Sequence, residues 1–157
     1  MSNKDFKHQK HIHIDLPIIG KHIIVFNTLL LAKQQEHKGK SISDIYLHQW
    51  KYAIDPIRAS EIFADIIYAA LVANAQLNQT ELQYTYSDVF AGVEDKWMED
   101  PMYFNDLQIA YANNIMGYVE RIRVTQGKLR NELDIKKNNT ASSISTKKQL
   151  QDSESAQ

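Results

Sequence analysis

The pattern of apolar and polar positions predicts a two-stranded hairpin near the start of the chain, followed by helices. Residues 11–16 alternate strictly between polar and aliphatic side chains, as in a half-buried strand. Residues 22–27 are rich in β-branched and aromatic residues, and the intervening Gly20-Lys21 favours a turn. A two-stranded hairpin is marginally stable alone, so we expect it to pack on the helices or on another copy of itself.

The segment 59–77 carries the clearest helical pattern. Its apolar residues recur at the spacing of one helical face: Ile62, Phe63, Ile66, Ile67, Ala70, Leu71 and Ala73. Ser60 is predicted to cap the start of this helix, with Glu61 and Asp65 near the positive end of the helix dipole. Because its many alanines allow neighbouring backbones to approach closely, we interpret this segment as the central helix of a small core.

Four further segments show helical periodicity together with helix-end signals. Gly39 suits a C-cap, Ser41 suits an N-cap, and Pro56 and Pro101, each preceded by aspartate, mark helix boundaries. The predicted helices span residues 28–37, 42–53, part of 84–95 with Thr85 or Ser87 as the cap, and 101 to about 123.

The helical pattern disappears near residue 132. Residues 133–157 contain no aromatic and few aliphatic side chains, so they cannot bury enough surface to offset the entropy of ordering. We therefore predict a flexible N-terminus at 1–10, a single domain at 11–132 and a disordered C-terminal tail at 133–157. The predicted fold class is α+β, mainly α, with an N-terminal β-hairpin followed by about five helices.

Composition and charge exclude several classes of protein. The chain of 157 residues contains no cysteine, which excludes disulfide frameworks, thiol catalysis and cysteine-based zinc sites. The formal net charge of -1 provides no general attraction for nucleic acid. The polar N-terminus lacks the apolar run of a signal peptide, and no apolar run is long enough to span a bilayer. We expect a cytoplasmic protein.

Three histidines near the hairpin form the strongest candidate metal cluster. His11 and His13 lie on the same side of the predicted strand, and His8 precedes it. No clear third ligand is fixed by the pattern, and a solvated outer face of an edge strand is the preferred explanation. The sequence also lacks a Gly-rich phosphate loop, HExxH and GxSxG. We expect a non-enzymatic protein without a cofactor or bound metal.

Basic residues at the end of the last predicted helix raise the possibility of nucleic-acid binding. Arg121, Arg123 and Arg130 lie there, but Glu120 and Glu132 dilute their positive charge. Cations are also favoured at helix C-termini in general. We therefore do not expect nucleic acid as a partner.

Aromatic and methionine side chains gather around the loop before the last helix. Such residues are enriched at protein interfaces, although a small separate core beneath the loop is an alternative explanation. The predicted partner-binding residues are Trp97, Met98, Met102, Tyr103, Phe104 and Tyr111.

Four sequence segments occur in an order that resembles a known family. They are 18–26 (IIGKHIIVF), 39–45 (GKSISDI), 66–71 (IIYAAL) and 85–95 (TYSDVFAGVED). These segments resemble those of the tail assembly chaperones of long-tailed bacteriophages. That family has, in the same order, a hairpin with a Gly-Lys turn, a G-x-S-[ILV] helix start, an Ala-rich I-x-Y-A-[GA]-L helix and a T-x-x-D-V helix that ends in acidic residues. The match covers roughly residues 12–95. It departs from the family at Asn27-Thr28, where glycine is common.

The resemblance implies a non-enzymatic function. A protein of this family binds the tape-measure protein, keeps it soluble and recruits tail-tube subunits, and homo-oligomerisation fits the marginal hairpin. No catalytic residue is carried over. Two alternatives remain open: a structural or adaptor protein of a phage particle, and a His-dependent metal-binding protein.

Overall fold

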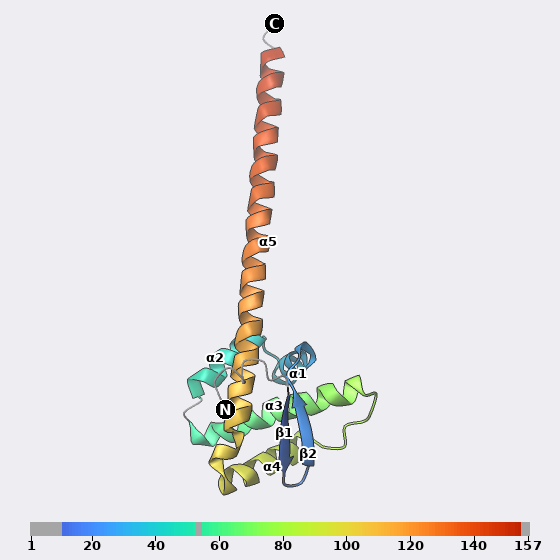
Figure 1. Cartoon of the computed structure of the whole chain (residues 1–157). Coiled ribbons are helices and arrows are strands. Elements are labelled where there is room, and N and C mark those ends of the chain that lie inside the picture. The colour runs from blue at the N-terminus through green and yellow to red at the C-terminus, as the bar shows by residue number, and fades with distance from the viewer. Residues whose placement is uncertain (1–10, 53–54, 155–157) are drawn as a thin grey trace. The chain divides into compact units, whose positions relative to one another are not determined.

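The computed structural model describes residues 11–52 and 55–154, and it confirms a mainly helical α+β fold with an N-terminal hairpin. The chain divides into two compact units, residues 1–117 and 118–157. The hairpin and the helical core belong to the first unit (Figure 1). None of the helices in the described residues combines the length and hydrophobicity that crossing a bilayer requires.

The hairpin pairs strand β1 (His11–Leu16) with strand β2 (Gly20–Val25) in antiparallel register, with His11 opposite Val25 and Leu16 opposite Gly20. The three aliphatic residues of β1 are buried and its polar residues are exposed, as the alternation predicts. The turn lies at residues 17–19, before Gly20 rather than at it. Ile18 adopts the left-handed conformation with φ of 74°, which is unfavourable for a β-branched residue.

Helices α1 (Thr28–Lys38) and α2 (Ile42–Tyr52) are joined by a short connection. Gly39 ends α1 in the left-handed conformation with φ of 62°, which confirms its predicted role as a C-cap. The Ser41 hydroxyl accepts a hydrogen bond of 3.2 Å from the amide of Asp44, as expected for an N-cap. The predicted end of α2 at Ala53 lies outside the described residues.

Helix α3 (Pro56–Leu77) begins earlier than the sequence pattern predicts. The Asp55 side chain accepts a hydrogen bond of 3.0 Å from the amide of Ile57 and caps the helix, so the prediction of Ser60 as the cap is wrong. Proline is favoured in the first helical turn because its missing N–H is not needed there. Ser60 is instead buried within the helix.

Helix α3 is the central element of the first unit, as predicted. It contacts α1, α2, α4 (Tyr86–Glu99) and β2 (Figure 1). Ala64, Ile67 and Ala70 on α3 are completely buried, and the small alanines permit this close packing on several sides. The side-chain amide of Asn74 donates a hydrogen bond of 2.9 Å to the backbone carbonyl of Ile23 and so connects α3 to β2.

Helix α4 starts with a complete capping box. The Thr85 hydroxyl accepts a hydrogen bond from the amide of Asp88, and the Asp88 carboxylate accepts one of 2.8 Å from the amide of Thr85. Thr85, one of the two predicted caps, is therefore the cap. Val89 and Val93 are fully buried, while Phe90 is half-buried.

A short 3₁₀ helix, η2 (Pro101–Phe104), connects α4 to the last helix, α5 (Asn105–Glu154). Asp100 caps η2 through a hydrogen bond of 3.2 Å to the amide of Met102, which confirms the predicted helix start. Within the first unit, Leu107, Ala110 and Ile115 of α5 are buried.

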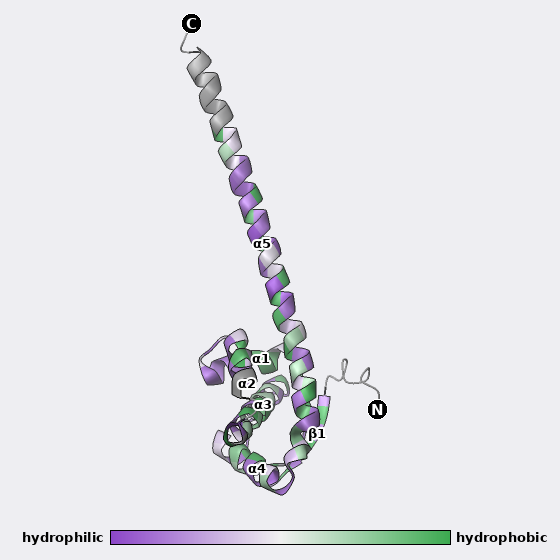
Figure 2. Cartoon of the chain, turned by 90° about the vertical axis from the view of Figure 1, so that its left-hand side faces the viewer, coloured by the Kyte–Doolittle hydropathy of each residue, from purple (hydrophilic) through white to green (hydrophobic). Residues whose placement is uncertain are grey.

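The C-terminal part of α5 differs from the predicted tail. The sequence predicts a helix end near residue 123 and disorder from 133, but α5 continues through Glu154. No proline follows Pro101, so nothing blocks the continuation of the helix. Every side chain from 123 to 144 is exposed, and Figure 2 shows mainly hydrophilic residues there with single hydrophobic ones between them. This polar composition is the property on which the prediction of disorder rests.

Candidate functional site

Three aromatic rings form the base of the predicted binding region. Phe63 of α3 stacks on Phe104 of η2 with ring centroids 4.8 Å apart, and Trp97 of α4 lies 5.7 Å from Phe63. Phe104 is completely buried, whereas Trp97 is half-buried. The contacts fix the orientation of the indole ring while part of its surface stays accessible.

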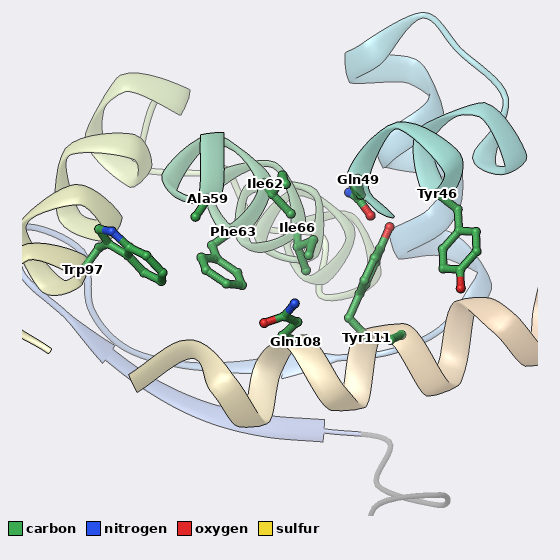
Figure 3. A pocket seen from close by; sticks show the side chains of 10 residues that line it. Tyr46, Gln49, Ala59, Ile62, Phe63, Ile66, Trp97, Gln108 and Tyr111 are labelled. Atoms are coloured by element: carbon green, nitrogen blue, oxygen red, sulfur yellow. The ribbon is translucent and has the colours of Figure 1, made fainter. Parts of the chain in front are cut away.

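The exposed side of this aromatic group forms the wall of an apolar pocket of about 90 Å³ (Figure 3). Side chains from α2, α3, α4 and α5 line it: Tyr46, Gln49, Ala59, Ile62, Phe63, Ile66, Trp97, Gln108, Tyr111 and Ala112. All of these residues belong to the first unit. Because an engineered apolar cavity of about 150 Å³ accommodates benzene, this pocket is suited to one aliphatic side chain.

A buried tyrosine adds polar groups to one wall of the pocket. The Tyr111 hydroxyl donates a hydrogen bond of 2.9 Å to Oε1 of Gln34, and Figure 3 shows it pointing toward Gln49. Burial raises the pKa of Tyr111, so the phenol remains protonated. The Nε2 atoms of Gln34 and Gln49 are buried without a hydrogen-bond partner among the described residues. Of these two residues, Gln49 lines the pocket, and its amide can donate to a carbonyl or hydroxyl oxygen there.

Two methionines next to the aromatic group are strongly exposed. Met98 at the end of α4 is 78% exposed and Met102 in η2 is 70% exposed. Unbranched, polarizable methionine side chains adapt to the shapes of different partners. Met98 follows Trp97 in α4 and Met102 lies in η2, so both expose apolar surface where these two elements are connected.

Tyr103 joins this corner to the hairpin. Its hydroxyl accepts a hydrogen bond of 2.7 Å from the amide of Asp15 and donates one of 3.2 Å to the Asp15 carbonyl. The Lys96 ammonium lies 4.7 Å from the centre of the Tyr103 ring, within the range of a cation–π contact. Tyr103 therefore positions η2 against β1.

The structure divides the predicted binding residues into two groups. Trp97, Met98, Met102 and Tyr103 retain exposed surface. Phe104 and Tyr111 are buried among the helices, although Tyr111 also lines the pocket. The stacking of Phe104 on Phe63 agrees with the alternative of a small core beneath the loop.

The pocket also contains residues that the sequence does not identify as a site. Tyr46 and Gln49 come from α2, and Ile62 lies on α3, where its periodicity predicts only core packing. The high aromatic content of residues 44–56 is the single local signal in this region. A pocket formed by four separate helices requires their packing to be known.

A second, polar cluster surrounds Asp65 of α3. Its carboxylate lies 2.5 Å from the Lys38 ammonium and 3.6 Å from His37 Nε2, and it accepts a hydrogen bond of 2.8 Å from Tyr86. Asp65 is almost fully buried, and a carboxylate in that environment requires such partners. Glu61 forms a further ion pair of 3.2 Å with Lys38.

The cluster shifts the pKa values of two partners of Asp65. Burial lowers the pKa of Lys38, but the hydrogen bond and negative charge of Asp65, together with Glu61, produce a net increase. Burial, followed by the hydrogen bond to Asp65, raises the pKa of Tyr86. Because the Asp65 carboxylate already has these partners, we assign the cluster a role in joining α1, α3 and α4.

The candidate histidine cluster has only two members in the described part of the chain. The rings of His11 and His13 are 5.9 Å apart on the exposed side of β1, and His8 lies outside the described residues. Within residues 11–52 and 55–154, no three histidine, cysteine, aspartate or glutamate side chains are grouped so that they could hold a metal ion.

Comparisons of the chain with protein-family models, with curated proteins and with solved structures find no match.

Proposed function

We propose that this protein is a non-enzymatic tail assembly chaperone of a long-tailed bacteriophage. It binds apolar helical segments of the tape-measure protein, keeps that protein soluble and brings tail-tube subunits to it. The proposal rests on the ordered resemblance of residues 12–95 to this family, together with a surface in the structure that suits such a partner.

The observation that carries the proposal is the apolar pocket beside Trp97. Its wall is fixed by the stacking of Phe63 on Phe104, so the partner does not need to order it. An amphipathic helix presents aliphatic side chains at intervals of three and four residues. One such side chain fits the pocket. Met98, next to Trp97 in sequence, and Met102 of η2 are exposed and provide adaptable contacts.

The proposed chaperone activity consists of covering apolar helical surface of the tape-measure protein. A long tape-measure protein exposes apolar stripes before the tail tube surrounds it, and exposed stripes of this kind promote aggregation. A binding protein that covers them with a pocket and flexible methionines prevents that association without any chemical step.

Co-expression with the long helical tail protein of the same phage tests the proposal. We expect the partner to remain soluble and to co-purify with the wild-type protein. The Met98→Glu/Met102→Glu double variant should lose most of this binding, because two charges replace exposed apolar contacts without disturbing the core.

Leu77→Glu is the matched control. Leu77 is also exposed, but it lies at the end of α3, beyond Ile66, the last pocket residue of that helix. Binding should therefore be retained. Equal binding by the double variant and the wild type would contradict the site. A partner that is indifferent to the protein, with the protein itself present in purified particles, would instead favour the structural or adaptor alternative.

A further inference from the structure

The part of α5 in the second unit is a helix without an evident source of stability. All side chains from 123 to 144 are exposed, so tertiary packing within the chain does not support them. This stretch also contains Gly127 and several Asn, Ser and Thr residues, which have low helix propensity. Isolated helices of such composition are marginal in water, and most helical stability in proteins comes from packing of an apolar face. Packing of its apolar residues against a partner would stabilise such a helix.

Four apolar residues share one face of this helix, whereas the exposed Val124 and Ile135 lie on other faces. Val119, Ile122, Leu129 and Leu133 follow one another at spacings of three, seven and four residues, and Gln126 occupies the intermediate position. Successive alternation of three and four residues is the a/d pattern of a coiled coil. Leu129 is 54% exposed and Leu133 is 59% exposed, whereas Val119 and Ile122 are half-buried. Lys136 and Thr140 continue the seam with polar residues, so the apolar part is short.

Charges on the two sides of this seam differ. With Val119 at position a, the e positions are Arg123, Arg130 and Lys137, all cationic. The g positions are Tyr118, Thr125, Glu132 and Asn139, none of which is cationic. Residues at e and g lie beside the seam and determine the choice and orientation of the partner helix.

These flanks favour one arrangement of two identical helices. In a parallel pair, e positions face g positions of the other helix, so Lys137 meets Glu132 and Arg123 meets the ring of Tyr118. In an antiparallel pair, e faces e, and three cations of one copy would oppose three cations of the other. The charge pattern is therefore complementary to a second copy of this chain only in the parallel orientation.

We propose that residues 119–140 of α5 pair with the same residues of a second copy as a parallel two-stranded coiled coil. The seam consists of Val119, Ile122, Gln126, Leu129 and Leu133, with Glu132–Lys137 ion pairs at its sides. A polar residue at an a position specifies register at a cost in stability, so Gln126 keeps the two copies aligned residue for residue. The dimer is independent of the pocket beside Trp97.

Sedimentation of the full chain over the micromolar concentration range tests dimerisation. We expect the mass to rise from that of one chain, 18.1 kDa, to twice that value. The Leu129→Glu/Leu133→Glu variant should stay monomeric at all of these concentrations. Val124→Glu/Ile135→Glu is the matched control, because these residues are 46% and 59% exposed but lie on the opposite side of the helix. This control should dimerise as the wild type does.

Cysteine cross-linking tests the orientation, and the absence of native cysteines makes it unambiguous. Gln126→Cys should oxidise to a disulfide-linked dimer, because position 126 of one copy lies beside position 126 of the other. Asn131→Cys, at the outer f position, should not. A monomeric wild type, or equal dimerisation by the two double variants, would overturn the proposal. Equal cross-linking at the two cysteine positions, or at neither, would overturn the parallel arrangement.

Discussion

A Cβ atom on Gly92 would lie 2.3 Å from the carbonyl oxygen of Pro17. Helix α4 therefore packs on the hairpin turn so closely that residue 92 can carry no side chain. The obstacle is backbone rather than a flexible side-chain end, so the strain cannot be relieved by a change of rotamer.

The first prediction concerns this contact. Gly92→Ala should lower the free energy of unfolding by about 1–3 kcal/mol, since the turn or the helix must shift to avoid the methyl group. Gly117→Ala is the control: nothing lies within 4 Å of a Cβ at Gly117, and alanine there should raise stability by about 0.5–1 kcal/mol. Urea unfolding followed by circular dichroism measures both. Equal stabilisation by the two variants would contradict the packing of α4 on the turn.

The second prediction concerns the buried carboxylate at the centre of the first unit. Asp65→Asn removes the charge that faces Lys38 and should destabilise the fold by about 2–3 kcal/mol, because breaking a buried ion pair leaves a poorly compensated charge. The exposed pair of Lys33 and Glu36, with 3.0 Å between its charged atoms, is the reference. Glu36→Gln should cost at most about 0.5 kcal/mol. Chemical denaturation of both variants at neutral pH makes the comparison, and similar losses would argue against a structural role for Asp65.

The third prediction concerns alkaline pH. The folded-state pKa of Tyr86 lies above its ordinary value of 10.0, so the unfolded chain loses this proton first. The protonated Tyr86 side chain therefore contributes fully to the stability of the fold below about pH 10, and this contribution decreases as the pH rises further. The raised pKa of Lys38 acts in the same direction, above its ordinary value of 10.5. The free energy of unfolding should therefore fall above pH 10, and Tyr86→Phe should reduce the slope of that fall.

Tyr84→Phe provides the control for this pH experiment. Tyr84 is also half-buried and contacts the ring of His22 rather than Asp65. This variant keeps the hydrogen bond between Tyr86 and Asp65, so the loss of stability that this bond causes at alkaline pH should persist. If Tyr86→Phe and the wild type lose stability in parallel between neutral and alkaline pH, the hydrogen bond to Asp65 does not govern the titration.

The fourth prediction separates the buried from the exposed members of the aromatic region. Phe104→Ala should cost about 3–5 kcal/mol, because it opens a cavity where the ring stacks on Phe63. Met98→Ala, at a strongly exposed position, should change stability by less than about 0.5 kcal/mol. Thermal unfolding of the two variants distinguishes these effects. A small loss for Phe104→Ala would mean that the ring belongs to the accessible surface after all.

The local elements could be predicted from the sequence where a short-range pattern determines them. Strict alternation identified β1, Gly39 identified the end of α1, and Thr85 with Asp88 identified the start of α4. Each signal acts within a few residues of the structure that it determines, so no knowledge of packing is needed.

At the start of α3 two local signals compete: Ser60 has the chemistry of a cap, but Asp55 and Pro56 begin the helix earlier and leave Ser60 inside it. Other features depend on residues far apart in the chain. The partners of Asp65 come from α1 and α4, and no spacing within α3 indicates them. The distinction between buried Phe104 and exposed Met102 likewise arises only when η2 packs against α3 and β1.

The hairpin turn has a consequence for the order of folding. Ile18 must enter the left-handed region, and the strands are held in place by Asn74 and Tyr103, which are 51 and 88 residues away from their partners in sequence. Loop closure over such separations is entropically costly, and contacts of this range slow folding. We therefore expect the helices around α3 to pack together first. The two strands should then pair on the surface of these helices in a later step of folding.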